Sequence, residues 1–208
     1  MQLTSTSIRN GQPIAPSLAF CQAAAEGHTA HGGNRSPHLA WSGAPDGTRS
    51  FAVVMHDPDV PADASDANTE GKTLAAGAER VDFFHWLLVD VPASTTEIAE
   101  GAASDGVTAN GKAPGRSALG LQGINDFTAF LAGSPMAGTY GGYDGPCPPW
   151  NDERLHHYHV TVYALDVETL GLDADGGFRG ADVRAALEGH VLAEAAIMGT
   201  YTTNPAVG

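Results

Sequence analysis

Positive charge is scarce in this sequence. Lys and Arg total 10 against 24 Asp and Glu, which gives a formal net charge of −14, and only Lys72 and Lys112 are lysines. Such a surface repels nucleic acid and anionic lipid headgroups at long range, and a polybasic patch of the kind that recruits proteins to membranes is missing. We therefore expect no nucleic-acid partner and no stable membrane attachment. Any bound anion must be held by local donors.

Long apolar runs and clustered cysteines are also absent. No apolar stretch approaches the length needed to cross a bilayer, and residues 1–7 lack a basic region followed by an apolar one. The two cysteines, Cys21 and Cys147, form neither a disulfide framework nor a zinc motif by their spacing. These absences predict a cytoplasmic protein whose two thiols stay unpaired in a reducing compartment.

Signatures of common enzymes are missing too. The sequence has no Gly-x-Ser-x-Gly nucleophile elbow, no P-loop and no dinucleotide-binding fingerprint. We therefore expect no cofactor and favour a binding protein over an enzyme. At 208 residues the chain is long enough for one domain with a sizeable core, so we predict a single domain over residues 1–208.

Hydrophobic patterning predicts a mainly β fold with a helix near the C-terminus. Three short apolar runs with flanking turn residues read as buried strands, over residues 50–56, 83–89 and 158–164. A helix period extends from about residue 181 to 198. Its apolar stripe consists of Val183, Leu187, Val191, Ala195 and Met198.

The first predicted strand runs into an acidic corner, Asp57-Pro58-Asp59-Val60-Pro61. This corner could be part of a site or an Asp-Pro turn that leaves the strand, and the Val60–Pro61 bond could be cis. His85 lies in the middle of the second apolar run, where a histidine is either a hydrogen-bonded core residue or a ligand-binding one. Strand alternation places its neighbour Trp86 on the opposite side.

A third polar cluster joins a stiff Gly-Pro loop, residues 145–149, to three histidines. Rigid loops of this kind suit the rim of a binding site. Alternation puts Tyr158, Val160 and Val162 on one face together with His156. His157 and His159 then face the other way, so the three histidines cannot all chelate one ion. Two of them could still do so, but we expect no metal site.

These clusters can form one pocket if the strand ends meet. Asp57 could then hydrogen-bond a histidine, which would leave N–H donors of His85 and His156 for an anion. Trp86 and Tyr158 would supply an apolar rim.

The same segments resemble a known family, in the same order along the chain. Residues 34–52 resemble its Ser-Pro-x-Leu-x-Trp and Gly-x-Lys-Ser-Phe-Ala segment, and residues 57–61 its Asp-Pro-Asp-x-Pro motif. Residues 84–92 resemble a Trp-His-Trp strand, and residues 143–158 a Gly-Pro-x-Pro-Pro and His-Arg-Tyr block. With a similar tail over 188–201, the chain resembles the phosphatidylethanolamine-binding protein (Raf kinase inhibitor protein) family, in its bacterial YbhB/YbcL-type branch.

The resemblance implies a fold and a site. The fold has two antiparallel sheets, the larger one central, with short helices on the flank. The implied pocket takes phosphate, phosphorylated headgroups or small carboxylates. Its residues would be Asp57, His85, Gly145, Pro146, His156 and Tyr158. Asp59 would orient a histidine or the loop. Because members of the bacterial branch often form homodimers, the resemblance also implies a homodimer.

Two alternatives to a small-anion-binding protein stay open. His85 or His156 could act as a general base beside Asp57 in a hydrolase or lyase. The chain could instead be a dimeric interaction module that resembles the family's kinase inhibitors. The sequence departs from the family pattern at Phe84 and His157, and it has longer connections over 62–82 and 124–142 that could reshape the pocket mouth.

Overall fold

Three long strands form the centre of the molecule in the computed structural model, which describes residues 1–175 and 177–207. They are β6 (Ser50–Pro61), β7 (Arg80–Pro92) and β11 (His156–Leu165). Each contains one of the predicted strands and extends beyond it. Their β-branched and aromatic residues pack well on a pleated surface that is covered by other elements, which favours the extended conformation.

These strands belong to a seven-stranded sheet with the order β2-β12-β11-β6-β7-β10-β9. Its other members are β2 (Gln12–Pro13), β9 (Gly115–Arg116), β10 (Leu121–Gln122) and β12 (Val191–Tyr201). Neighbours are antiparallel except β2 and β12, which are parallel. The predicted fold class is confirmed, and the parallel pair makes the central sheet mixed.

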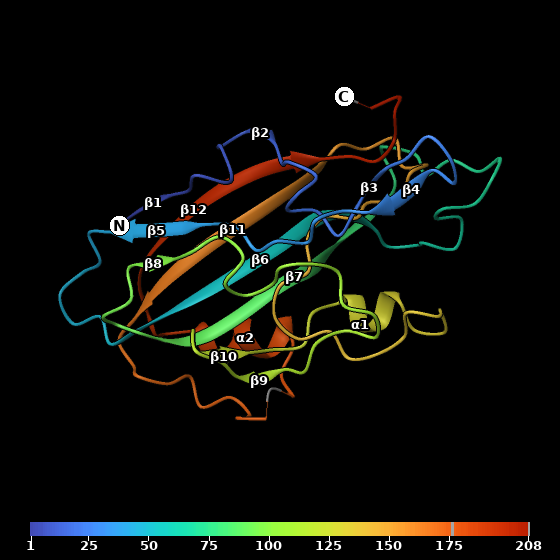
Figure 1. Ribbon diagram of the computed structural model, residues 1–208. Helices are drawn as coiled ribbons and strands as arrows, with labels where there is room; N and C mark the ends of the chain where they lie inside the picture. Colours follow the sequence, from blue (N-terminus) through green and yellow to red (C-terminus); the bar gives the residue numbers. More distant parts are fainter. Residues whose placement is uncertain (176, 208) are drawn as a thin grey trace.

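Smaller elements cover the two faces and one end of the central sheet (Figure 1). A three-stranded sheet of β1 (Gln2–Thr4), β5 (Leu39–Ser42) and β8 (Glu97–Ile98) packs on one face through Trp41 and Phe51, whose rings lie 5.2 Å apart. Helix α2 (Gly180–Leu187) covers the other face through Val183 and Leu187. Hairpin β3 (Cys21–Ala23) and β4 (Thr29–His31) lies toward the same end as α1 (Phe127–Phe130).

The predicted C-terminal helix is right only in its first half. Helix α2 ends at Leu187, and Gly189 then adopts a φ of +80°, a left-handed conformation that glycine takes at little cost. Residues 191–201 form β12 instead, which pairs with β11 over nearly its full length. Pairing with an open strand edge outweighs the helix propensity of this Ala-rich segment, because tertiary context routinely overrides local propensity.

The acidic corner is not a turn. Strand β6 continues through it to Pro61, so Asp57 and Asp59 are strand residues, and the described part of the chain contains no cis peptide bond. None of the helices in that part is long and apolar enough to span a membrane.

Candidate functional site

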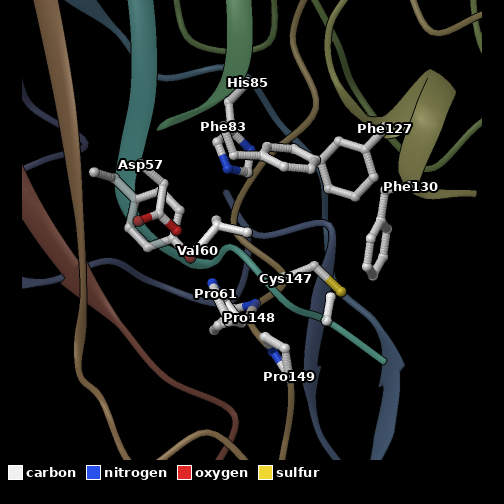
Figure 2. A pocket seen from close by; sticks show the side chains of 12 residues that line it. Asp57, Val60, Pro61, Phe83, His85, Phe127, Phe130, Cys147, Pro148 and Pro149 are labelled. Carbon is white, nitrogen blue, oxygen red and sulfur yellow. The ribbon is translucent and has the colours of Figure 1, made fainter. Parts of the chain in front are cut away.

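A small cavity of about 40 Å³ lies at the end of the central sheet, where β6, β7 and β11 meet α1 and the Gly-Pro loop (Figure 2). Its wall consists of Asp57, Val60, Pro61, Ala64, Phe83, His85, Phe127, Phe130, Cys147, Pro148, Pro149 and Tyr158. One water needs roughly 10–15 Å³, so the cavity admits a group of a few heavy atoms. Most of the wall is apolar, and the polar side chains in it are Asp57, His85 and Tyr158.

A β-bulge aims His85 into this cavity. The register between β6 and β7 shifts so that Met55 pairs with Trp86 but His56 pairs with Phe84, which leaves His85 as an extra residue. A bulge re-aims side chains, and here His85 lies 5.2 Å from the Tyr158 ring, on the face where Trp86 is buried. The prediction that Trp86 faces away from His85 is therefore wrong, because simple alternation fails at the bulge.

His85 is held as a neutral imidazole with a defined tautomer. Its Nδ1 lies 2.8 Å from the carbonyl oxygen of Asp144, and a carbonyl only accepts, so Nδ1 carries the hydrogen. Burial lowers the pKa of His85 below its ordinary 6.5, against the opposing effect of the Asp57 carboxylate. Nε2 has no hydrogen-bond partner among the described residues and is left for a ligand.

The backbone that holds His85 is fixed by the buried Asp144 carboxylate. It accepts hydrogen bonds from Asn34 Nδ2 (2.8 Å), Asn125 Nδ2 (2.8 Å) and Lys112 Nζ (2.7 Å). Asn34 Oδ1 in turn accepts from the backbone N–H of Gly145 at 2.8 Å. Sequence reasoning missed this network, although Asn34 lies in a family-like segment and Lys112 is one of only two lysines.

His156 does not line the cavity but lies behind Asp57, between two carboxylates. Its Nδ1 is 2.6 Å from Asp57 Oδ2 and its Nε2 is 3.1 Å from Asp152 Oδ2. Burial alone would lower the pKa of His156, but the hydrogen bonds to Asp152 and Asp57 outweigh it and raise the pKa to about 9. The ring is therefore an imidazolium with both N–H groups engaged, so neither is left to donate to an anion or to act as a base.

Asp152 completes this buried chain of charges. It also accepts two hydrogen bonds from Arg80, at 2.6 and 3.1 Å. Burial opposes ionisation of Asp152, but its bonds to His156 and Arg80 prevail and lower its pKa to about 2. The negative charges of Asp57 and Asp152 are thus balanced by the positive charges of His156 and Arg80. The carboxylate of Asp57, which lies in the cavity wall, is paired with the His156 imidazolium, which does not line the cavity.

Asp59 points away from the cavity and orients a histidine other than the ones in the predicted pocket. Its carboxylate accepts from the backbone N–H of His157 at 3.0 Å, from His157 Nδ1 at 2.7 Å, and from Arg154 Nε. Burial opposes ionisation, yet these bonds lower the pKa of Asp59. As alternation predicted, His157 and His159 are half-buried on the face opposite the fully buried His156.

Tyr158 presents the most informative polar atom in the cavity wall. Its side chain is fully buried, and its hydroxyl makes no hydrogen bond of standard geometry with the described residues, although the Asp57 carboxylate lies close to it. Burial raises the pKa of Tyr158 well above its ordinary value, and the negative charge of Asp57 and its contact with the hydroxyl raise it further. The hydroxyl therefore keeps its proton and can donate. Trp86, which was predicted to form part of the rim, does not line the cavity, and its Nε1 donates to Gln122 Oε1 at 3.0 Å.

The Gly-Pro loop forms the rim one residue further along than predicted. The Gly145 N–H is used by Asn34, and the Pro146 carbonyl accepts from the N–H groups of Phe20 and Cys21. The next three residues, 147–149, line the cavity. The connection over 62–82 contributes Ala64 to the wall.

Cys147 is not a free thiol. It forms a disulfide with Cys21, so the prediction of two unpaired thiols is wrong. A sequence separation of 126 residues gave no sign that the fold brings the two together. The two cysteines therefore do not indicate a reducing compartment, and the cytoplasmic location stays a prediction.

No three His, Cys, Asp or Glu side chains within residues 1–175 and 177–207 are placed to hold a metal ion. The acidic and imidazole groups around the cavity are instead paired with one another. The absence of a resident metal or cofactor remains an expectation.

The buried chain of charges predicts the pH range of stability. His156 has a folded-state pKa above its ordinary 6.5, so its stabilising effect is complete below that pH and is lost as the pH rises through about 9. Asp152 has a pKa below its ordinary 3.8, so its effect is present above that pH and is lost as the pH falls through about 2. We expect urea unfolding to show a loss of about 3 kcal/mol between pH 6.5 and 10.

His156→Gln provides the control for that pH profile. The variant should be less stable at pH 6.5, yet its free energy of unfolding should not fall in the same way above pH 7. An equal alkaline loss in the wild type and the variant would assign the pH dependence to other groups.

Comparisons with known proteins agree with this architecture. A family model described as phosphatidylethanolamine-binding protein matches residues 4–202. The UPF0098 protein of Aquifex aeolicus is 33% identical over 201 residues, which cover 97% of this chain and 88% of the relative. UPF0098 protein YbcL of Escherichia coli is 33% identical, covering 96% and 86%.

Solved structures show the same likeness. The crystal structure of E. coli YbcL, described as a new member of the mammalian PEBP family, matches with a TM-score of 0.67 and 31% identity over 97% of both chains. A PEBP homologue from Chlamydia trachomatis matches with a TM-score of 0.62 and 28% identity, covering 96% of this chain and 95% of the other.

Proposed function

This chain belongs to the phosphatidylethanolamine-binding protein family, and on that premise we propose that it binds a small phosphate-bearing or other anionic ligand in the cavity beside Asp57. The observation that carries the proposal is the Tyr158 hydroxyl, a buried donor in the cavity wall that lies beside Asp57 but makes no hydrogen bond of standard geometry in the described structure. A buried hydroxyl that makes no hydrogen bond costs free energy, and an anionic oxygen in the cavity would satisfy it.

His85 supports a ligand that binds together with a proton. While the ring is neutral, Nε2 carries a lone pair and can only accept a hydrogen bond from a ligand in the cavity. When the ring is protonated, Nε2 becomes a donor. A hydrogen phosphate can donate its own P–OH to Nε2 and accept from Tyr158. A fully ionised anion needs the imidazolium. Either arrangement places one proton between His85 and the ligand.

The rest of the cavity suits an oxyanion with little bulk. The His156 imidazolium neutralises the negative charge of Asp57, so an anion in the cavity is not repelled by an unpaired carboxylate. Phe83, Phe127 and Phe130 line the cavity with apolar rings, which lower the polarity around the hydrogen bonds inside. Hydrogen bonds to a charged group strengthen in such a low-dielectric setting.

Titration calorimetry with inorganic phosphate tests the proposal. Tyr158→Phe removes the hydroxyl and keeps the ring, so we expect affinity to fall roughly 10-fold or more, the effect of one hydrogen bond to a charged group. Tyr163→Phe is the matched control, since Tyr163 lies on the same strand but packs on the other face of the sheet. Equal phosphate affinity in the wild type and Tyr158→Phe would refute the proposed site.

The role of His85 predicts a pH dependence of binding. Sulfate keeps a constant charge between pH 5 and 8, so a change in its affinity reports the protein. Burial holds the pKa of free His85 below 6.5, while three neighbouring carboxylates, Asp57, Asp126 and Asp144, oppose that shift. A bound anion stabilises the imidazolium, so we expect affinity to fall about tenfold per pH unit above this pKa.

His85→Gln is the control for the sulfate experiment. It keeps a polar side chain of similar reach but cannot titrate, so its weaker sulfate binding should not vary with pH. Wild-type affinity that stays constant from pH 5 to 8 would contradict the proposed proton.

A further inference from the structure

The Cys21–Cys147 disulfide forms part of the cavity wall. Cys147 lines the cavity together with Pro148 and Pro149, and Figure 2 shows its sulfur below Phe130 and above Pro149 in that view. Cys147 is partly exposed, whereas Cys21 is only 5% exposed. Of the two sulfur atoms, the one on Cys147 is therefore the one that a molecule inside the cavity can reach.

The disulfide also joins the rim to the aromatic wall. Phe20, which precedes Cys21, stacks on Phe127 with ring centroids 4.5 Å apart, and Phe127 lines the cavity. The N–H groups of Phe20 and Cys21 both donate to the carbonyl oxygen of Pro146. The bond thus ties the loop over 145–149 to the segment that supports one side of the cavity.

We propose that this disulfide is a thiol-exchange site built into the ligand cavity, so that a low-molecular-weight thiol and the anionic ligand compete for the same space. A thiolate enters and attacks Sγ of Cys147. The S–S bond breaks, and its electron pair leaves on Sγ of Cys21, which takes up a proton. A second thiolate attacks the outer sulfur of this mixed disulfide. The bond to Cys147 breaks, its electron pair leaves on Sγ of Cys147, which takes up a proton, and the oxidised thiol dimer is released, so two thiols supply the two electrons.

Competition and coupling follow from this geometry, and both rest on the proposed function. A bound anion fills the approach to Cys147 and slows the attack. Reduction frees the loop from the β3 segment, so the reduced protein binds the anion more weakly. Coupling between two binding or chemical states is reciprocal, so ligand must also favour the disulfide over the thiols.

The route of the thiol can be tested without any ligand. Native protein is incubated with 2-mercaptoethanol, a thiol small enough for the cavity, and the appearance of two thiols is followed by alkylation and mass spectrometry. Ala64→Trp adds a large ring to the cavity wall without changing either cysteine, and should slow reduction about fivefold or more, because exchange depends on access to the sulfur. Ala78→Trp, in the same connection but outside the wall, should react like the wild type. Equal rates in all three proteins overturn the proposed route.

Competition is tested by repeating the reaction with saturating inorganic phosphate, after calorimetry on the same sample. Slower reduction with phosphate, and about fivefold or weaker phosphate binding by Cys21→Ala/Cys147→Ala, are the expected results. If calorimetry detects phosphate binding but the reduction rate and the variant's affinity do not change, the coupling is refuted. If calorimetry detects no phosphate binding, the proposed function is refuted instead, and the Ala64→Trp comparison still decides whether thiols enter through the cavity.

Discussion

Asp152→Ala is expected to lower the free energy of unfolding by about 3–5 kcal/mol, the cost of leaving buried charges without their partner. Asp152 is 1% exposed and accepts from Arg80 twice and from His156 once. Removing it leaves the buried His156 imidazolium with Asp57 alone and Arg80 without a carboxylate. Urea unfolding near pH 6.5, where the wild-type cluster is intact, measures the loss directly.

A surface pair of the same chemistry provides the control. Asp66 pairs with Lys72 at 3.3 Å, but both side chains are about half exposed. Asp66→Ala should change the free energy of unfolding by roughly 0.5 kcal/mol or less, as is usual for exposed ion pairs. A comparably small loss for Asp152→Ala would mean that water enters the buried cluster and screens it, and the raised pKa of His156 would then lose its explanation.

The same cluster shows what a sequence can and cannot predict about a site. Alternation along residues 156–164 correctly placed His156 and Tyr158 on one face, because side chains in a regular strand alternate. Alternation could not say which of the two lines the cavity. That depends on Asp152, which comes from the preceding loop and occupies the second nitrogen of His156.

His85 illustrates a second limit. Its place in an apolar run indicated a buried histidine, and its membership in a pocket depended on strand ends meeting, for which only the family resemblance gave support. The bulge that aims it at Tyr158 is a property of the pairing between β6 and β7, which the sequence of either strand alone does not contain. The Asp144 network was missed for the same reason, since Asn34, Lys112 and Asn125 come from three separate segments.

The helix predicted beyond residue 190 was wrong for a different reason. Residues 191–201 carry residues that favour a helix, and their apolar positions continue the stripe of α2. The long edge of β11 offers backbone hydrogen bonds along the whole segment, and Ile197 then packs into the core with Val160. A local period cannot predict a partner strand whose paired residues lie 26 to 45 positions earlier in the chain.

Removal of the disulfide is the second change for which we expect a large effect. The bond closes a loop between residues 126 positions apart, and in the chain-entropy account such a long loop restricts the unfolded chain strongly. We expect Cys21→Ala/Cys147→Ala to lose about 3 kcal/mol, within the usual range for a native disulfide. At roughly 2–4 °C per kcal/mol for a chain of this size, the melting temperature should fall by about 6–12 °C.

Reduction of the wild type should reproduce this effect and separate the bond from the side chains. With dithiothreitol, the wild type should melt close to the double-alanine variant, while the variant itself should not respond to the reductant. Thiol titration must confirm that both sulfurs are free in the reduced sample. A fully reduced wild type with an unchanged melting temperature would show that the contacts of Phe20 and Pro146 hold this end of the sheet by themselves. In that case the bond would have no structural effect, and thiol exchange in the cavity would be its only remaining role.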